Sequence, residues 1–230
     1  MGSEMCIRDS GKNPHIATNG SGTWLMAWDS TGTSDTDIRY CRSTDNGNTW
    51  SAGNWLNSGA TSDNGVFRNY DGQVRLAANS AGVWVAVWTS SYDPLSTVPV
   101  TDRIVFARSQ DDGATWSVPA PIDPLKLVGT PAEQMPDVVW SGTQFALIWS
   151  GPSGLEASYS STGATWATPV AVAASPGFEG GPESRPRLAT GSASLRLTAW
   201  IRRPAGATGP DIIAAQDAIA AGIAEWNLYW

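Results

Sequence analysis

Two segments of this sequence place a carboxylate and a tryptophan at the same spacing. They are STDNGNTW (43–50) and SQDDGATW (109–116), in which Asp45 and Asp111 each stand five residues before the tryptophan. Paired carboxylates can serve as the acid and base of a hydrolase. An aspartate can also accept hydrogen bonds from backbone N–H groups two residues further on, and so close a tight turn. The two residues alone leave both interpretations open.

A third segment, YSSTGATW (159–166), keeps the glycine, threonine and tryptophan, but Tyr159 replaces the serine and Ser161 replaces the aspartate. The glycines suit a positive φ angle. Each tryptophan is expected to cover its turn, which contributes about 1.5–3 kcal/mol where the side chain is fully buried. The predicted turn residues are Ser43, Asp45, Gly47, Thr49, Trp50, Ser109, Asp111, Gly113, Thr115, Trp116, Gly163, Thr165 and Trp166.

Longer repeats surround these turns. Four phrases of alternating apolar residues each carry a tryptophan near their end: GTWLMAWDS (22–30), GVWVAVWTS (82–90), TQFALIWSG (143–151) and LRLTAWIRR (195–203). A related phrase precedes each of them: NPHIATNG (13–20), QVRLAANS (73–80), MPDVVWSG (135–142) and RPRLATGS (185–192). A third kind follows: DIRYCRS (37–43), RIVFARS (103–109), LEASYSS (155–161) and, more weakly, DIIAAQD (211–217).

The repeats predict an all-β protein. Each contains a strand, a tight turn, a strand, a longer loop, a strand, the special turn and a last strand, which makes four antiparallel strands. Repeats of this length with aromatic signatures are typical of a β-propeller. Four of a predicted six blades are visible, at about 11–58, 72–123, 134–173 and 184–230. Alanine enrichment favours a helix only over 214–224, which is alternatively a degenerate blade.

Residues 1–10, MGSEMCIRDS, match one translation of a transposon-end adapter from sequencing libraries. We interpret them as an artefact and set them aside before considering the fold. Residues 11–230 are then expected to be part of a longer propeller, because four blades alone would leave bare sheet edges.

Composition narrows the classes of function. The net charge of −7 and the pI of about 4.6 argue against nucleic-acid binding. The sequence has no apolar run long enough to span a membrane. With Cys6 set aside, Cys41 is a lone thiol, and His15 is the only histidine, so we predict no metal site and no cofactor. The acidic balance and the Ser/Thr/Gly-rich loops favour a secreted or cell-surface protein.

The special turn resembles the Asp-box, or bacterial neuraminidase repeat, S-x-D-x-G-x-T-W. The first two turns match it nearly completely and the third in part, in register with the strand repeats over about residues 11–200. The chain therefore resembles the sialidase-like superfamily. The resemblance implies that the box joins the third and fourth strands of a blade, away from the active site. Asp45 and Asp111 are accordingly expected to be structural residues.

Catalytic members of this superfamily hold a sugar carboxylate with three arginines. They use a tyrosine nucleophile assisted by a glutamate, together with an aspartate acid/base. Their R-I-P signature is absent here, where Lys12-Asn13-Pro14 stands at the corresponding place. The catalytic residues therefore remain unassigned. Residues of suitable type on the expected site-side loops are Tyr70, Tyr92, Glu133, Glu179 and Glu183, with Asp35, Asp63, Asp93 and Asp102 as acids.

Aligning the predicted innermost strands on their second residue yields one polar position per blade. The four residues are His15, Arg75, Asp137 and Arg187, and they are expected to surround the mouth of the central channel. Two arginines there would suit a carboxylate or sulfate on a ligand. The alternative is a set of ion pairs in which Asp137 neutralises one of the arginines.

The sequence supports two hypotheses of function. The first is a secreted propeller that binds a glycan or another surface ligand, without proven catalysis. The alternative is an exo-sialidase-type glycoside hydrolase that releases terminal sialic acids. Because one fold hosts many functions, the repeat pattern cannot choose between them. The repeat pattern also carries no information about the oligomeric state.

Overall fold

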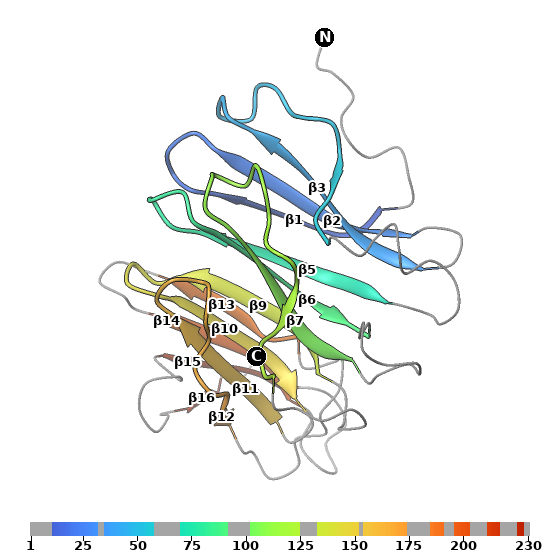
Figure 1. The fold of residues 1–230 in the computed structure, drawn as a ribbon. Coiled ribbons are helices and arrows are strands. Elements are labelled where there is room, and N and C mark those ends of the chain that lie inside the picture. Colours follow the sequence, from blue (N-terminus) through green and yellow to red (C-terminus); the bar gives the residue numbers. More distant parts are fainter. Residues whose placement is uncertain are drawn as a thin grey trace. The chain divides into compact units, whose positions relative to one another are not determined.

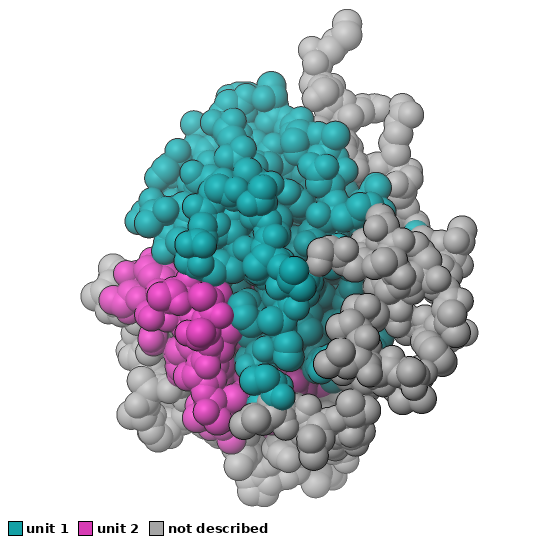
Figure 2. Space-filling view, in the orientation of Figure 1, with its two compact units in different colours: residues 1–130 teal, residues 131–230 magenta. Residues whose placement is uncertain are grey.

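The computed structural model describes residues 11–31, 35–57, 70–91, 102–124, 133–151, 154–173, 185–190, 196–202, 211–216 and 225–227. Every regular element in these ranges is a β-strand, so the predicted all-β class is confirmed. The chain divides into two compact units, residues 1–130 and residues 131–230 (Figure 2). Each unit contains two four-stranded sheets.

Unit 1 holds two antiparallel sheets in which the strands lie in chain order (Figure 1). The first sheet consists of β1 (Gly11–Thr18), β2 (Trp24–Thr31), β3 (Thr36–Ser43) and β4 (Asn54–Trp55). The second consists of β5 (Asp71–Ala78), β6 (Trp84–Ser90), β7 (Arg103–Ser109) and β8 (Ala120–Pro121). The last strand of each sheet has only two residues, which makes it a short edge.

Unit 2 repeats the same pattern of pairing. Its first sheet consists of β9 (Gln134–Trp140), β10 (Phe145–Gly151), β11 (Gly154–Ser160) and β12 (Val170–Ala173). Its second consists of β13 (Arg187–Thr190), β14 (Arg196–Arg202), β15 (Asp211–Gln216) and β16 (Glu225–Asn227).

The helix expected over 214–224 is wrong in its first part. Residues 214–216 belong to β15, where Ala214 pairs with Ala199 and Ala215 pairs with Thr198 of β14. Residues 217–224 lie outside the described residues. Pairing along β14 supplies the backbone hydrogen bonds of this segment, and that tertiary interaction overrides the local helix propensity of alanine.

The repeated tryptophans anchor the hydrophobic cores. Trp28, Trp88 and Trp149 are at most 1% exposed. Every residue of β6 and of β10 is buried, which means that both faces of these strands are covered. In unit 1, the core joins Leu25 of the first sheet to Leu76 of the second. Burial of this kind is the main stabilising contribution to such a fold.

A left-handed residue recurs near the start of the first strand in every sheet. These residues are Asn13, Gln73, Met135 and Arg185, with φ angles of 48°, 63°, 57° and 36°. The strand register shifts at the same place in the β1–β2, β5–β6 and β9–β10 pairs. An extra residue of this kind is a β-bulge, which re-aims the side chains that follow it. Each bulge comes two residues before a member of the set His15, Arg75, Asp137 and Arg187.

Candidate functional site

In unit 1, a buried carboxylate ties three strands together at the end of β2. Asp29 is only 2% exposed, and its Oδ2 accepts hydrogen bonds from Asn13 Nδ2 of β1 (2.7 Å) and from the backbone N–H of Gln73 in β5 (2.9 Å). Burial raises the pKa of Asp29, and the hydrogen bonds from its neighbours oppose that shift. Asp29 therefore fixes the two bulges next to it.

A second buried network lies at the start of β5. The carboxylate of Asp71 accepts the indole N–H of Trp88 (2.9 Å) and the side-chain amide of Asn57 (2.8 Å). The same amide donates to Asp37 (2.8 Å), while Asn57 Oδ1 accepts the N–H of Ile38 (3.1 Å). Asp37, Asn57 and Asp71 are all at most 4% exposed. One asparagine thus bridges two buried carboxylates, which would otherwise repel each other.

Tyr70 immediately precedes β5 and is surrounded by negative charge. Burial, followed by the charges of Asp29, Asp102 and Asp71, raises the pKa of Tyr70 to about 12. The phenol is therefore protonated near neutral pH. In that state it can donate a hydrogen bond to a ligand, but it is a poor nucleophile unless a base removes its proton.

The four predicted channel-mouth residues fall into two kinds. His15 Nδ1 accepts the backbone N–H of Leu76 (3.1 Å), and Asp137 Oδ2 accepts that of Leu188 (2.8 Å). Each of these two side chains thus joins the first strand of one sheet to the first strand of the next. Arg75 and Arg187 instead donate from Nη1 to the carbonyl of the residue before them, at 2.8 Å in both cases.

In unit 2, Glu133 takes the place that Asp71 has in unit 1. It is 2% exposed, and its Oε1 accepts the indole N–H of Trp149 (2.9 Å). Glu156 accepts the same N–H at 3.0 Å. This arrangement gives Glu133 a structural role in holding the tryptophan. Of the other loop residues offered by the sequence, Tyr92, Asp63, Asp93, Glu179 and Glu183 lie outside the described residues.

The first two special turns have the same hydrogen-bonded geometry. Asp45 Oδ1 accepts the N–H of Thr49 (2.8 Å), and Asp45 Oδ2 accepts its hydroxyl (2.6 Å). Ser43 Oγ accepts the N–H of Gly47 (2.9 Å). The second turn repeats these contacts with Ser109, Asp111, Gly113 and Thr115. The pKa of both Asp45 and Asp111 is lowered to about 2, and the hydrogen bonds from Thr49 and Thr115 are the largest cause.

The third turn is one residue shorter than the alignment implied. The N–H of Gly163 bonds Ser160 Oγ (2.7 Å), so Ser160, at the end of β11, occupies the serine position rather than Tyr159. In the first two turns, a non-glycine residue with positive φ precedes the glycine, namely Asn46 or Asp112. The third turn has positive φ only at Gly163. The lost residue therefore removes both the carboxylate and one left-handed position.

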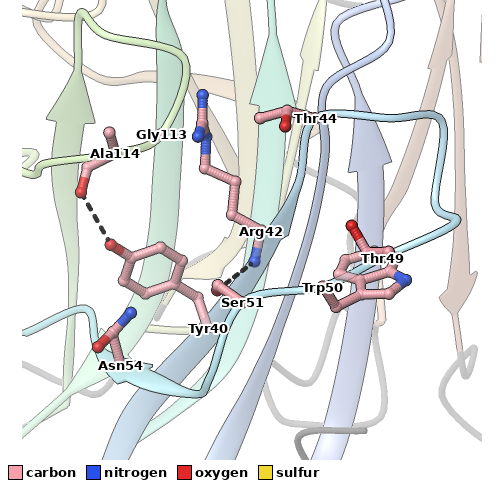
Figure 3. Close-up of a pocket in the computed structure, with 9 residues that line it drawn as sticks. All are labelled: Tyr40, Arg42, Thr44, Thr49, Trp50, Ser51, Asn54, Gly113 and Ala114. Atoms are coloured by element: carbon pink, nitrogen blue, oxygen red, sulfur yellow. Dashed lines mark hydrogen bonds between the residues drawn. The ribbon is translucent and has the colours of Figure 1, made fainter. Parts of the chain in front are cut away.

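A pocket of about 400 Å³ lies beside the first special turn in unit 1 (Figure 3). It lies at the opposite ends of the strands from Asp29 and Asp71, because the special turns follow the last residues of β3 and β7. Side chains of β3, the 43–50 turn and the segment after it line most of the pocket, and the second turn closes it. The lining residues are Tyr40, Arg42, Thr44, Thr49, Trp50, Ser51, Asn54, Gly113 and Ala114.

Within the described ranges, no group of three or more His, Cys, Asp or Glu side chains is arranged to hold a metal ion. Over the same residues, no helix has the length and apolar character needed to cross a bilayer.

Sequence reasoning did not single out Asp29, Asp71 or Asn57. The sequence does contain a positional signal for Asp29 and for Asp71. Asp29 follows the repeated tryptophan at a position where the other phrases have Thr89, Ser150 and Ile201. Asp71 and Glu133 stand 17 and 16 residues before the tryptophans that they bind. Asn57 had no such signal, because it lies beyond the aligned phrases.

No protein-family model matches this chain, and a search of curated proteins finds no match. Solved structures do match. A Hadza microbial sialidase aligns at 20% identity over 90% of this chain and 45% of its own, with a TM-score of 0.59. The NanB sialidase from Streptococcus pneumoniae aligns at 12% identity over 97% of this chain and 53% of its own, with a TM-score of 0.68.

The likeness extends to other glycosidases. An α-L-arabinanase from Penicillium chrysogenum aligns at 16% identity over 97% of this chain and 68% of its own, with a TM-score of 0.63. This chain thus spans about half the length of the two sialidases. At these identities the comparisons establish the architecture and not the reaction. The chain has the sialidase-like β-propeller fold.

Proposed function

We propose that this chain is part of a secreted or cell-surface β-propeller that binds glycans. The observation that carries the proposal is the range of solved structures with this fold. They are described as sialidases, intramolecular trans-sialidases, arabinofuranosidases and an arabinanase. These proteins differ in the reactions their names describe, and a carbohydrate substrate is what those names share. The fold therefore supports the class of ligand and leaves the reaction open.

The polar residues at the end of β2 and the start of β5 fit a protein that binds a ligand without catalysing a reaction. The carboxylates of Asp29 and Asp71 are each occupied by two or more hydrogen bonds that hold strands together. Tyr70, with its pKa of about 12, is a neutral phenol at physiological pH. The protonated phenol of Tyr70 can donate to a sugar hydroxyl but is not an activated nucleophile, and the carboxylates act as acceptors that hold the neighbouring strands.

We assign different tasks to the two kinds of residue in the set His15, Arg75, Asp137 and Arg187. His15 and Asp137 support the site, because each already accepts a backbone N–H from the neighbouring sheet. Arg75 in unit 1 and Arg187 in unit 2 are each proposed as a ligand contact of its own unit. Each guanidinium donates a hydrogen bond to the preceding carbonyl, and Arg187 is exposed. An arginine offers five N–H donors in a planar fork, which suits a carboxylate on a sugar.

The test uses methyl α-sialoside, which carries a carboxylate and no second sugar, and titration calorimetry with the purified chain. We expect binding that weakens by roughly tenfold or more in Arg75→Ala or Arg187→Ala, as for loss of a charge-assisted hydrogen bond. Arg108→Ala is the matched control, because Arg108 lies at the special-turn end of β7. A glycan array without any ligand for this chain would refute the glycan-binding proposal.

The second candidate function is exo-sialidase activity, favoured by the sialidases among the similar structures. Its test is release of the fluorophore from 4-methylumbelliferyl sialoside. We expect no turnover above background. Turnover that is lost in Tyr70→Phe and kept in Tyr159→Phe would identify Tyr70 as the nucleophile and overturn the binding-only proposal.

A further inference from the structure

We propose that the pocket beside the first special turn is a separate site for a neutral saccharide. It lies between the first sheet and the 109–116 turn, both of which belong to unit 1. Its volume of about 400 Å³ falls within the range of small-molecule sites. The inference does not depend on the proposed function, because the residues concerned lie at the other ends of the strands.

The pocket is held in shape by bonds between the two sheets. Tyr40 donates its hydroxyl hydrogen to the carbonyl of Ala114 (3.1 Å), and Arg42 Nε donates to the carbonyl of Asp112 (2.7 Å). Asn19 Nδ2 adds a bond to Asp112 Oδ1 (2.9 Å). These contacts fix the second turn against the first sheet. A preformed site loses less conformational entropy when a ligand binds.

The lining combines aromatic rings with hydroxyl and amide groups. In Figure 3, Tyr40 and Trp50 lie on either side of Arg42 and Ser51. The indole N–H of Trp50 donates to the carbonyl of Gly47 (3.0 Å), so what this half-buried side chain offers a ligand is its ring surface. Thr44 and Asn54 are exposed at the same pocket and carry groups that pair with sugar hydroxyls.

The surrounding charges select a neutral ligand over an anionic one. Arg42 is the only charged residue among those that line the pocket, and its Nε is engaged by Asp112 O. Asp45 bonds Thr49 in the wall, and the charge of Asp111 acts on Tyr40. One cation beside the two carboxylates of Asp45 and Asp111 disfavours an anionic sugar, whereas an uncharged sugar with one apolar face can lie on the indole.

The probes are lactose and cellobiose, with methyl α-sialoside as the anionic comparison. Binding is followed by ligand-observed NMR and calorimetry on the purified chain. We expect millimolar binding of at least one neutral disaccharide. Thr44→Ala and Asn54→Ala should each weaken it by about threefold to tenfold, as for loss of one hydrogen bond. Gln110→Ala is the matched control, since Gln110 is the exposed equivalent of Thr44 in the second turn and does not line the pocket.

Each outcome of these binding experiments either supports the proposed saccharide site or overturns it. Absence of binding for both neutral disaccharides overturns the proposal, as does binding that is equally weakened by Gln110→Ala. Binding that survives Thr44→Ala and Asn54→Ala unchanged also overturns it, because the ligand then sits elsewhere. Binding of methyl α-sialoside that is weakened by Arg75→Ala and unchanged by Thr44→Ala bears only on the proposed function. Failure of either proposal therefore leaves the other intact.

Discussion

The carboxylate of Asp71 accepts the indole N–H of Trp88 inside the core of unit 1, at 2.9 Å between Oδ1 and Nε1. Trp88 is the repeated tryptophan of β6, and it is 1% exposed. Glu133 makes the corresponding bond to Trp149 in unit 2. A carboxylate that accepts the indole N–H of the repeated tryptophan therefore occurs in each unit, where it offsets the cost of burying that N–H.

The first prediction concerns the loss of this anchor. Asp71→Ala leaves both the Trp88 indole and the Asn57 amide without that acceptor. We expect the free energy of unfolding to fall by about 1–3 kcal/mol for each donor left unsatisfied. Trp88→Phe in the Asp71→Ala background should recover part of this loss, since it removes one of the two donors. Urea denaturation followed by circular dichroism measures both variants, and an Asp71→Ala protein as stable as wild type would contradict the account.

The second prediction concerns the pH dependence that Asp29 causes. Because burial raises its pKa in the folded state, the folded protein binds the proton more tightly than the unfolded chain. Stability should therefore fall as pH rises from the ordinary carboxyl pKa of 3.8 through the raised value. Asp29→Asn removes this slope. Urea midpoints measured from pH 4 to pH 7 test the idea, which fails if the variant keeps the slope of the wild type.

The third prediction concerns the opposite slope from the special turns. The pKa of Asp111 is lowered to about 2, so its contribution is complete above pH 3.8 and is lost as pH falls through about 2. Asp111→Asn should flatten the acid limb of the stability curve and leave the slope between pH 4 and pH 7 unchanged. Acid titration followed by fluorescence checks this. Together with Asp29→Asn, it separates two carboxylates whose effects have opposite sign.

The repeats made the architecture predictable. Tryptophan spacing and alternating apolar residues placed the strands of the sheets, because burial of these side chains is dictated locally by the pattern. The helix expected over 214–224 failed because strand pairing with β14 outweighed alanine propensity. The third turn was misaligned by one residue, since a tryptophan and a glycine alone do not reveal a deletion upstream of them.

The polar contacts were harder to predict than the strands. Asp29 and Asp71 acquire their roles from partners on other strands, and the pairs are 16, 44 and 17 residues apart in the chain. His15 and Asp137 share an aligned position in the sequence repeats, but nothing in the sequence shows that they accept N–H groups from the next sheet. Such contacts depend on the bulges, which set side-chain direction and have no fixed sequence signature.

The last prediction compares two glycines in the left-handed region. Gly113 has φ of +80°, and a Cβ there would lie 2.5 Å from Leu25 Cδ1 in the core. Gly20 has φ of +74°, and a Cβ there would meet nothing within 4 Å. Gly20→Ala should therefore cost only the backbone strain, about 1–2 kcal/mol.

Gly113→Ala should cost that strain and a further ~1–3 kcal/mol of overpacking against Leu25. Thermal and urea unfolding of the two variants measure the difference directly. Gly113→Ala/Leu25→Ala serves as the control, because it makes room for the new methyl group and should recover the overpacking part relative to Leu25→Ala alone. Equal destabilisation by Gly20→Ala and Gly113→Ala would mean that the second turn does not pack on the first sheet as closely as the structure has it. The pocket beside that turn would then lose the wall that gives it a fixed shape.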